Sequence, residues 1–484
     1  MKQIDVWFTV SEVQGIVKTG GLADVAKALP IALKDKGLSV RVVMPAYRSV
    51  PDIESCPIVL DTELSYWPHT PYKVRSAEFN GIEVFLIDND DFFNRPELYA
   101  EHNRAYADNG DRFAFFSSAS LDVLPKLGLK PDVIHANDWH TGLVPFLLKV
   151  RYVSDDYFAD MKSVLTVHNA MFKGVFSADE LQSIPELHVS GMEHLQYGYG
   201  YISMLRAGIA YADRVNAVSP NYAMELMTPL GSHGLVDDFV SRSRDLYGIL
   251  NGCDYSEWNP QTDVYLPKNY DASSAESVAE GKLANKNALQ ESFHLPKRDV
   301  PLFGMVCRLT AQKGFHYLLP ILSEFLRNDV QIAIVGTGEP EMANQLHNIA
   351  SQYPEKCAFF EAYSNEYAHL VEAGSDFFLM PSEFEACGLN QIYSMAYGTL
   401  PIVRTVGGLK DTVIDFDRNP DDATGFSFSD PTPQALLICM QRALILYLQQ
   451  PDIYKEVQLR AMSRDFSWSD SANEYIKMYK NALM

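Results

Sequence analysis

The side chain whose setting most suggests chemistry is Glu385, which lies between a predicted strand and a predicted helix. The apolar run Phe377–Met380 predicts a buried parallel strand. After Gly388, apolar residues recur at helical spacing until Gly398. Ligands bind at such turns of open α/β sheets, because helix N-termini favour anions there. A carboxylate repels phosphate, so Glu385 is expected either to accept hydrogen bonds from hydroxyl groups of a neutral ligand moiety or to cap the helix.

Two basic side chains follow another predicted strand of the same half, at residues 302–306. Arg308 and Lys313 stand just before a predicted helix. A diphosphate bound there would gain two charge-assisted hydrogen bonds, each worth about 1.5–3 kcal/mol. As solvated surface charges the two residues would contribute little, and the sequence leaves both interpretations open.

The N-terminal half begins with a similar arrangement. A predicted strand at residues 4–10 is followed by Lys18, by Gly20 and Gly21, and by a predicted helix from Leu22. The segment lacks the glycine patterns of dinucleotide-binding and Walker motifs. Adjacent glycines let backbone amides approach a phosphate closely. A tight turn with a solvated lysine is the slightly favoured alternative on these residues alone.

Polar side chains follow three predicted parallel strands of this half. Parallel strands end at one edge of a sheet, so these side chains are expected to converge on one crevice. The pairs are Glu12 and Lys18, Asp138 and His140, and His168 and Asn169.

Two successive α/β alternations predict two doubly wound domains. Residues 51–112 are expected to form an insertion of short strands and loops. The expected domains are 1–248 and 249–460, with a C-terminal helix in 461–484 that packs back on the first domain.

Composition narrows the classes of partner. The 484 residues carry a formal net charge of −22, which disfavours nucleic acid. The six cysteines form no C-x-x-C pair and no metal-like cluster. The chain starts directly in a strand, without a signal peptide, and has no apolar run long enough to cross a membrane. We therefore expect a cytoplasmic protein without a membrane partner; the oligomeric state stays open.

Seven motifs together resemble the bacterial glycogen synthase and plant starch synthase family, in family order and over essentially the whole chain. They are KTGGLAD (18–24), HANDWHTGL (135–143), TVHN (166–169), ILNGCDYSEWNP (249–260), RLTAQKG (308–314), FEACGLNQ (384–391) and FSW (466–468). The resemblance implies a GT-B fold, with two Rossmann-like domains facing a deep cleft. It implies transfer of glucose from ADP-glucose to the non-reducing 4-OH of an α-1,4-glucan, with retention of configuration. No cofactor or metal is implied, because cationic side chains offset the charge of the departing ADP.

The resemblance also implies roles for individual residues. Arg308 and Lys313 would hold the diphosphate, Tyr363 would stack on adenine, and Glu385 would accept hydrogen bonds from the glucose hydroxyls. Amides of Cys387, Gly388 and Leu389 would lie nearby. From the N-terminal domain, Lys18, Gly20 and Gly21 would approach the diphosphate, and Asp24 belongs to the same motif. His168 would contact the glucose near its anomeric carbon, Asn169 would orient it, and Asp138 and Asn251 would line the sugar subsite. The residues expected to act in catalysis are His168, Glu385, Arg308, Lys313 and Asp138.

Three positions and one short segment depart from the family pattern. Gly15 stands where proline is common, Asn137 where a second histidine is usual, and Val406 where threonine commonly precedes Gly-Gly-Leu. Residues 170–173 also differ. These changes put acceptor length and donor nucleotide in more doubt than the reaction class. The alternatives are a related GT-B transferase that uses another nucleotide sugar or short maltodextrins, a phosphorylase with pyridoxal phosphate, and a non-catalytic glucan-binding protein.

Overall fold

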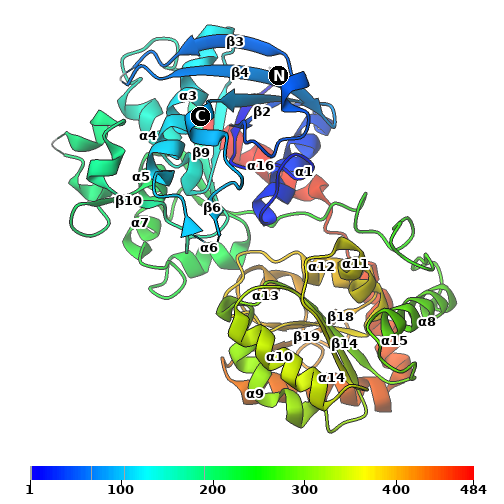
Figure 1. The fold of residues 1–484 in the computed structure, drawn as a ribbon. Helices are drawn as coiled ribbons and strands as arrows, with labels where there is room; N and C mark the ends of the chain where they lie inside the picture. The colour runs from blue at the N-terminus through cyan, green and yellow to red at the C-terminus, as the bar shows by residue number, and fades with distance from the viewer. Residues whose placement is uncertain (1–2, 67, 103, 190) are drawn as a thin grey trace. The chain divides into compact units, whose positions relative to one another are not determined.

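The computed structural model describes residues 3–66, 68–102, 104–189 and 191–484. The chain forms two compact units (Figure 1). The N-terminal unit consists of Met1–Gly252 and Trp468–Met484, and the C-terminal unit of Cys253–Ser467.

The main sheet of the N-terminal unit has nine strands in the order β13-β12-β9-β8-β1-β2-β5-β4-β3. They are β1 (Asp5–Thr9), β2 (Ser39–Pro45), β3 (Ile58–Glu63), β4 (Pro71–Phe79), β5 (Ile82–Asp88), β8 (Val133–Asn137), β9 (Lys162–Val167), β12 (Arg214–Ala217) and β13 (Leu246–Gly248). The strands from β13 to β5 pair in parallel, and β4 and β3 extend the sheet in antiparallel fashion. Chain order reverses between β1 and β8, which is the switch point of a doubly wound sheet.

Helices and short hairpins connect these strands. The helices are α1 (Gly21–Asp35), α2 (Asp90–Phe93), α3 (Asn109–Leu127), α4 (Leu143–Val150), α5 (Met204–Tyr211), α6 (Pro220–Leu226), α7 (Val236–Ser241) and α16 (Trp468–Leu483). The short strands are β6 (Ala100–Glu101), β7 (Arg104–Ala105), β10 (Val175–Ser177) and β11 (Tyr201–Ser203).

Residues 51–112 differ from the expected insertion of short strands and loops. β4 and β5 are nine and seven residues long and belong to the main sheet. In β4 apolar residues alternate with charged ones, as in Val74 beside Lys73, because this strand lies near the edge of the sheet, where one face is solvated. This alternation is a weaker signal than the continuous apolar runs of the central strands.

The last helix, α16, packs on α1 and β9 of the N-terminal unit. Two tyrosines on its buried face place their hydroxyl groups beside polar side chains of the sheet. Tyr479 Oη lies 2.7 Å from His135 Nδ1, and Tyr475 Oη accepts a hydrogen bond of 3.0 Å from Asn216 Nδ2. His135 is fully buried, and its second ring nitrogen lies 2.7 Å from Thr166 Oγ1.

Tyr479→Phe is expected to destabilise the N-terminal unit by about 1–3 kcal/mol, because it leaves one buried nitrogen of His135 without a partner. Urea unfolding followed by tryptophan fluorescence measures the loss. Tyr199→Phe is the matched control, since the Tyr199 side chain is 99% exposed. Equal stability of the two variants would contradict a stabilising hydrogen bond between Tyr479 and His135.

The C-terminal unit contains a six-stranded parallel sheet in the order β16-β15-β14-β17-β18-β19. Its strands are β14 (Leu302–Val306), β15 (Gln331–Val335), β16 (Cys357–Phe360), β17 (Phe377–Met380), β18 (Leu400–Arg404) and β19 (Phe426–Phe428). This is the strand order of the dinucleotide-binding fold, with its switch point between β14 and β17. The expected α/β class with two Rossmann-like domains is confirmed.

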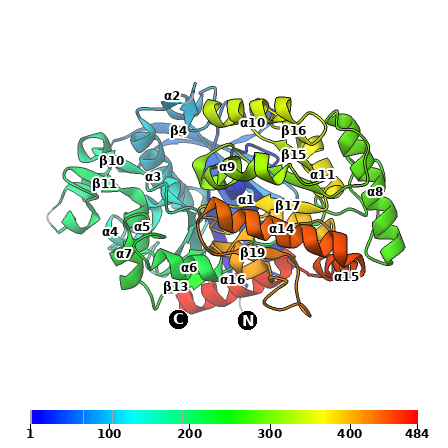
Figure 2. The same cartoon turned by 90° about the horizontal axis from the view of Figure 1, so that it is seen from below.

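Helices cover both faces of this sheet (Figures 1 and 2). They are α8 (Ala275–Ser292), α9 (Phe315–Phe325), α10 (Pro340–Gln352), α11 (Asn365–Gly374), α12 (Asn390–Ala396), α13 (Gly407–Thr412), α14 (Pro433–Gln449) and α15 (Pro451–Met462). Successive residues of one strand enter two different apolar clusters. Phe377 packs with α9, α10 and α14, whereas Phe378 packs with α8 and α11. Burial on both faces explains the continuous apolar runs in the sequence.

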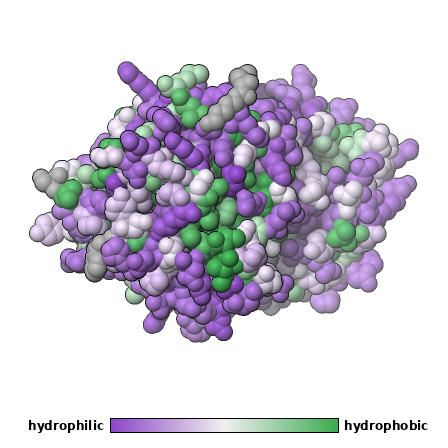
Figure 3. Space-filling model, turned by 90° about the horizontal axis from the view of Figure 1, so that it is seen from above, coloured by the Kyte–Doolittle hydropathy of each residue, from purple (hydrophilic) through white to green (hydrophobic). Residues whose placement is uncertain are grey.

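The face of the molecule drawn in Figure 3 is mostly hydrophilic. Figure 3 shows one apolar patch near the middle of the face seen from above. Of the helices in the described residues, none combines the length and apolar character that crossing a membrane requires.

Candidate active site

The first group of polar side chains lies at the switch point of the N-terminal unit. Glu12 follows β1, Asp138 follows β8, and His168 and Asn169 follow β9. β9, β8 and β1 are direct neighbours in the sheet, so the structure brings these three strand ends together as expected.

Asp138 joins two of these strand ends. Its Oδ1 accepts hydrogen bonds from the backbone amides of His168 (2.7 Å) and Asn169 (3.3 Å). Its φ of 55° is unusual for a residue with a side chain, and such strain concentrates at functional sites. Burial, with repulsion from Glu12 as a minor cause, raises the pKa of this carboxyl to about 7, although the two amide hydrogen bonds oppose the shift.

His168 presents a neutral ring. Burial lowers its pKa to about 3, so the imidazole is uncharged near neutral pH. Its Nε2 lies 2.9 Å from Oδ1 of Asn137, the last residue of β8. The residue can therefore exchange hydrogen bonds with a ligand without contributing a charge.

The glycine loop, Lys18 to Gly21, is held in place by the buried carboxylate of Glu12. Glu12 is 3% exposed and accepts hydrogen bonds from the Thr19 amide and from Thr19 Oγ1. Burial raises the pKa of Glu12. Lys18 Nζ lies 2.6 Å from Asp24 Oδ1. A Cβ atom at Gly20 or Gly21 would meet no atom within 4 Å, so the space beside the loop is open to a ligand.

Two further polar side chains of this unit, Asn251 and His140, are buried. Asn251 is 5% exposed, and its Oδ1 has no hydrogen-bond partner among the described residues. A buried acceptor without a partner suggests a ligand contact. His140, expected beside Asp138 in the crevice, packs its ring against Trp139, with centroids 4.0 Å apart, and against Tyr99. The buried Nδ1 of His140, like Asn251 Oδ1, has no hydrogen-bond partner among the described residues, so aromatic packing accounts for the ring but not for this nitrogen.

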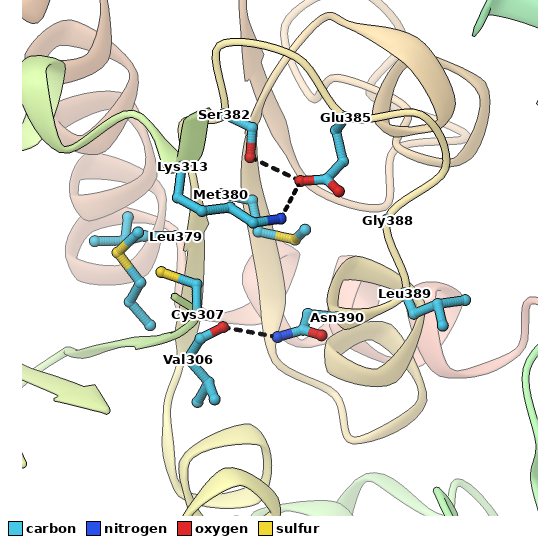
Figure 4. Close-up of a pocket in the computed structure, with 11 residues that line it drawn as sticks. Val306, Cys307, Lys313, Leu379, Met380, Ser382, Glu385, Gly388, Leu389 and Asn390 are labelled. Atoms are coloured by element: carbon cyan, nitrogen blue, oxygen red, sulfur yellow. Dashed lines mark hydrogen bonds and ion pairs between the residues drawn. The ribbon is translucent and has the colours of Figure 1, made fainter. Parts of the chain in front are cut away.

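The second group lies at the switch point of the C-terminal unit, between β14 and β17. A pocket of about 140 Å³ opens there (Figure 4). It is lined by Met305, Val306, Cys307, Lys313, Leu379, Met380, Ser382, Glu385, Gly388, Leu389 and Asn390. Asn390 Nδ2 donates to the Val306 carbonyl at 2.9 Å and thereby ties the start of α12 to β14.

An ion pair dominates this pocket. Lys313 Nζ lies 2.6 Å from Glu385 Oε2, and Ser382 Oγ donates to the same oxygen at 3.0 Å (Figure 4). The side chains of Lys313 and Glu385 are only 19% and 11% exposed. A cation and a hydroxyl-accepting carboxylate thus share one small, partly desolvated space, where electrostatic interactions are stronger than in water.

The backbone of the 381–389 loop is fixed by close contacts. Gly407 has a φ of 43°, and a Cβ there would lie 1.7 Å from the Glu385 carbonyl oxygen. Gly314 has a φ of 80°, and its Cβ would lie 1.9 Å from the Pro381 carbonyl oxygen. Only glycine permits both approaches. Glu385 is therefore held between the Lys313 segment and the start of α13.

Arg404 also fixes this loop. Its guanidinium donates to the carbonyl oxygens of Ser382, at 2.8 Å, and Glu383. The sequence pattern alone did not predict a role for Arg404, Ser382, Thr19 or Asn390. Arg404 ends a predicted strand, and Ser382 stands three residues before Glu385, but neither position carries a distinctive pattern.

Three of the expected nucleotide-binding residues lie outside this pocket. Arg308 is exposed and has no hydrogen-bond or ion-pair partner in the described part of the chain. Tyr363 is 79% exposed, and its hydroxyl donates to Asn365 Oδ1 at 3.0 Å. Cys387 is buried, and its carbonyl lies against Gly408. Gly388 and Leu389 do line the pocket, next to Glu385.

Comparisons with known protein families match both units. Residues 5–240 match the starch synthase catalytic domain, and residues 288–457 match the glycosyl transferases group 1 family. A glycogen synthase of Vibrio cholerae is 68% identical over 482 residues, covering 100% of this chain and 99% of the relative. A glycogen synthase of Vibrio atlanticus is 58% identical, with the same coverage.

Solved structures agree with this assignment. The catalytic domain of starch synthase IV from Arabidopsis thaliana, bound to ADP and acarbose, is 30% identical, with a TM-score of 0.89 over 100% of both chains. A sucrose-phosphate synthase from Thermosynechococcus elongatus shares the fold, with 18% identity and a TM-score of 0.59 over 99% of this chain and 98% of that one.

Both matching families consist of glycosyltransferases, and the chain is an enzyme of this class. Its identity to glycogen synthases over the full length places it in the glycogen synthase and starch synthase family.

Proposed function

We propose that this protein transfers glucose from ADP-glucose to the non-reducing 4-OH end of an α-1,4-glucan, with retention of configuration. The observation that carries the proposal is the ion pair of Lys313 and Glu385 in a pocket at the switch point of a Rossmann-like domain. The pocket offers a cation to a phosphate and a carboxylate to sugar hydroxyls. The match to a starch synthase that binds ADP and acarbose supports this choice of ligands.

In this proposal the C-terminal unit binds the nucleotide. Lys313 and Arg308 hold the diphosphate and stabilise its charge as ADP departs, which is the electrostatic part of catalysis. Glu385 accepts hydrogen bonds from glucose hydroxyls, close to the amides of Cys387, Gly388 and Leu389. Tyr363 stacks on adenine, and its exposed ring is free to do so.

Residues of the N-terminal unit act on the sugar and the phosphates. Asp138 orients the amides of His168 and Asn169, and His168 contacts the glucose with an uncharged ring. Asn251 offers its unpaired Oδ1 to the sugar. Lys18, Gly20 and Gly21 approach the diphosphate, and Asp24 holds the Lys18 ammonium until the ligand arrives.

The proposed chemistry replaces one bond to the anomeric carbon on the same face of the sugar. The glucan 4-OH forms a bond to that carbon as the bond to the ADP oxygen breaks, and the departing phosphate takes the proton of the attacking hydroxyl. The two bond changes share one face, so the configuration is retained. The protein positions the reactants and stabilises the leaving charge.

ADP release from ADP-glucose, with and without glycogen, tests the proposal. We expect release that depends on glycogen in the wild type and that collapses in Glu385→Ala, because the carboxylate that binds the glucose hydroxyls is gone. Release of UDP from UDP-glucose, without release of ADP from ADP-glucose, would overturn the donor assignment and keep the reaction class. Glucan binding without release from either donor would contradict the enzyme function and favour a binding protein.

A further inference from the structure

Asn137 sits beneath the candidate sugar site and contacts two groups on neighbouring strands. It is the last residue of β8 and is 0% exposed, so its side chain cannot touch a ligand. Its Nδ2 lies 3.0 Å from the backbone oxygen of Thr9 on β1. Its Oδ1 lies 2.9 Å from Nε2 of His168, just after β9.

The orientation of this amide follows from the chemistry of its partners. The Thr9 backbone oxygen can only accept a hydrogen bond, so the NH₂ group of Asn137 must face it. The carbonyl oxygen of Asn137 then faces His168, and a carbonyl oxygen can only accept. His168 Nε2 must therefore carry a proton.

The backbone of Asn137 is also held firmly. Its amide donates to Thr141 Oγ1 at 2.6 Å, and Thr141 Oγ1 donates to its carbonyl oxygen at 2.9 Å. These contacts and the parallel pairing with Thr166 of β9 fix the backbone, and the hydrogen bonds with Thr9 and His168 fix the side chain. The position is thus rigid enough to control its neighbour.

The remaining nitrogen of His168 faces no protein partner. Among the residues that the structure describes, none forms a hydrogen bond with Nδ1, and the side chain is only partly buried. Since the ring is neutral and Nε2 holds its proton, Nδ1 presents a lone pair.

We propose that Asn137 is a positioning residue that holds His168 in the Nε2–H tautomer, so that Nδ1 accepts a hydrogen bond from a hydroxyl group of the ligand. The identity of that ligand as a sugar rests on the proposed function. The tautomer selects a group that can donate, such as a hydroxyl, over a carbonyl or phosphate oxygen that can only accept. Asn137 thereby tunes what His168 recognises without contacting the ligand.

Nuclear magnetic resonance of ¹⁵N-histidine-labelled protein tests the tautomer directly, in the ligand-free enzyme. The His168 signals are assigned by their loss in His168→Gln. We expect the wild type at neutral pH to show one protonated nitrogen, Nε2, and an unprotonated Nδ1. Protonation at Nδ1, or rapid exchange between both tautomers, would overturn the proposal whether or not the protein transfers glucose.

Two variants separate positioning from mere structural support. Asn137→Ala removes the acceptor beside His168. Asn216→Ala is the matched control, because Asn216 is an equally buried asparagine of β12 that hydrogen-bonds Tyr475 and the Ile249 amide instead. Only Asn137→Ala should mix the two tautomers of His168, while the His135 signals stay unchanged in that variant.

The kinetic expectation is a fall in kcat of about tenfold for Asn137→Ala, equivalent to about 1.4 kcal/mol. The affinity for ADP alone should stay unchanged, because neither Asn137 nor His168 is among the residues proposed to hold ADP. Equal losses of kcat in Asn137→Ala and Asn216→Ala, with the Nε2–H tautomer kept in both, would overturn the positioning role.

Discussion

Lys313→Ala is expected to lower the rate of glucose transfer by about 100- to 1,000-fold, the usual effect of removing one preorganised group that stabilises a developing negative charge. Lys313 is the cation of the pocket at the switch point between β14 and β17, and its ammonium is already held in place, 2.6 Å from Glu385. ADP release at saturating ADP-glucose and glycogen measures the loss.

Arg308→Ala provides a comparison within the same segment. The Arg308 side chain is exposed and makes no ion pair with the described residues, so its loss should slow transfer and leave thermal unfolding unchanged. Lys313→Ala removes the partner of a carboxylate that is 11% exposed, so it should also lower stability, by about 1–3 kcal/mol. Lys313→Ala with nearly wild-type transfer would contradict the role given to this residue.

Glu385→Gln sharpens the test. In the ligand-free structure the Glu385 carboxylate is paired with the Lys313 ammonium, so a diphosphate must compete with Glu385 for Lys313. A glutamine can still accept the hydrogen bond from Ser382 but no longer neutralises the cation. We expect tighter binding of ADP and slower transfer of glucose in this variant. Weaker ADP binding would show that the ion pair does not compete with the nucleotide.

The sequence was most informative about elements buried on both faces. The strands β14 and β17 have the predicted bounds, Leu302–Val306 and Phe377–Met380, because helices cover both of their faces and leave continuous apolar runs. β4 was harder to predict, since Lys73 and Arg75 interrupt its apolar positions at a partly solvated edge. A strand of this kind resembles a polar loop unless its alternation is weighed.

The candidate site shows the complementary limit. Positions such as Asp138, His168 and Glu385 follow directly from their places at the ends of predicted strands. Their partners do not, because Lys313 meets Glu385 across 72 residues of chain and Asn137 meets His168 across 31. Such pairs depend on strand order and register, which no local pattern encodes. The packing of His140 among aromatic rings is a tertiary effect of the same kind.

The stability of the N-terminal unit is expected to fall as pH rises from about 4 to about 7, owing to Asp138. The pKa of this carboxyl is about 7 in the folded protein, against an ordinary value of 3.8. Between these values the folded state binds more protons than the unfolded state, so raising the pH favours unfolding. The total loss of folding stability that this pKa difference causes is about 4 kcal/mol, and it is reached above pH 7.

Asp138→Asn should remove this pH dependence. The amide oxygen of asparagine can still accept from the backbone amides of His168 and Asn169, so the local geometry is kept. Relative to the wild type, the variant should gain stability progressively between pH 4 and pH 8, measured by urea unfolding at each pH. Asp160→Asn is the control, because the Asp160 side chain is 89% exposed and its replacement should leave the pH dependence intact.

Activity should change in the opposite direction. An ionised carboxylate forms stronger hydrogen bonds with the amides of His168 and Asn169 than a neutral one does, and so fixes both residues more firmly. Wild-type transfer is therefore expected to rise with pH through about 7, the pKa of Asp138. Asp138→Asn should be slower and lack this rise. If Asp138→Asn is more stable than the wild type and equally active at pH 8, the negative charge of Asp138 does not contribute to catalysis. If the variant is more stable but slower, the enzyme retains a destabilising charge because catalysis requires it.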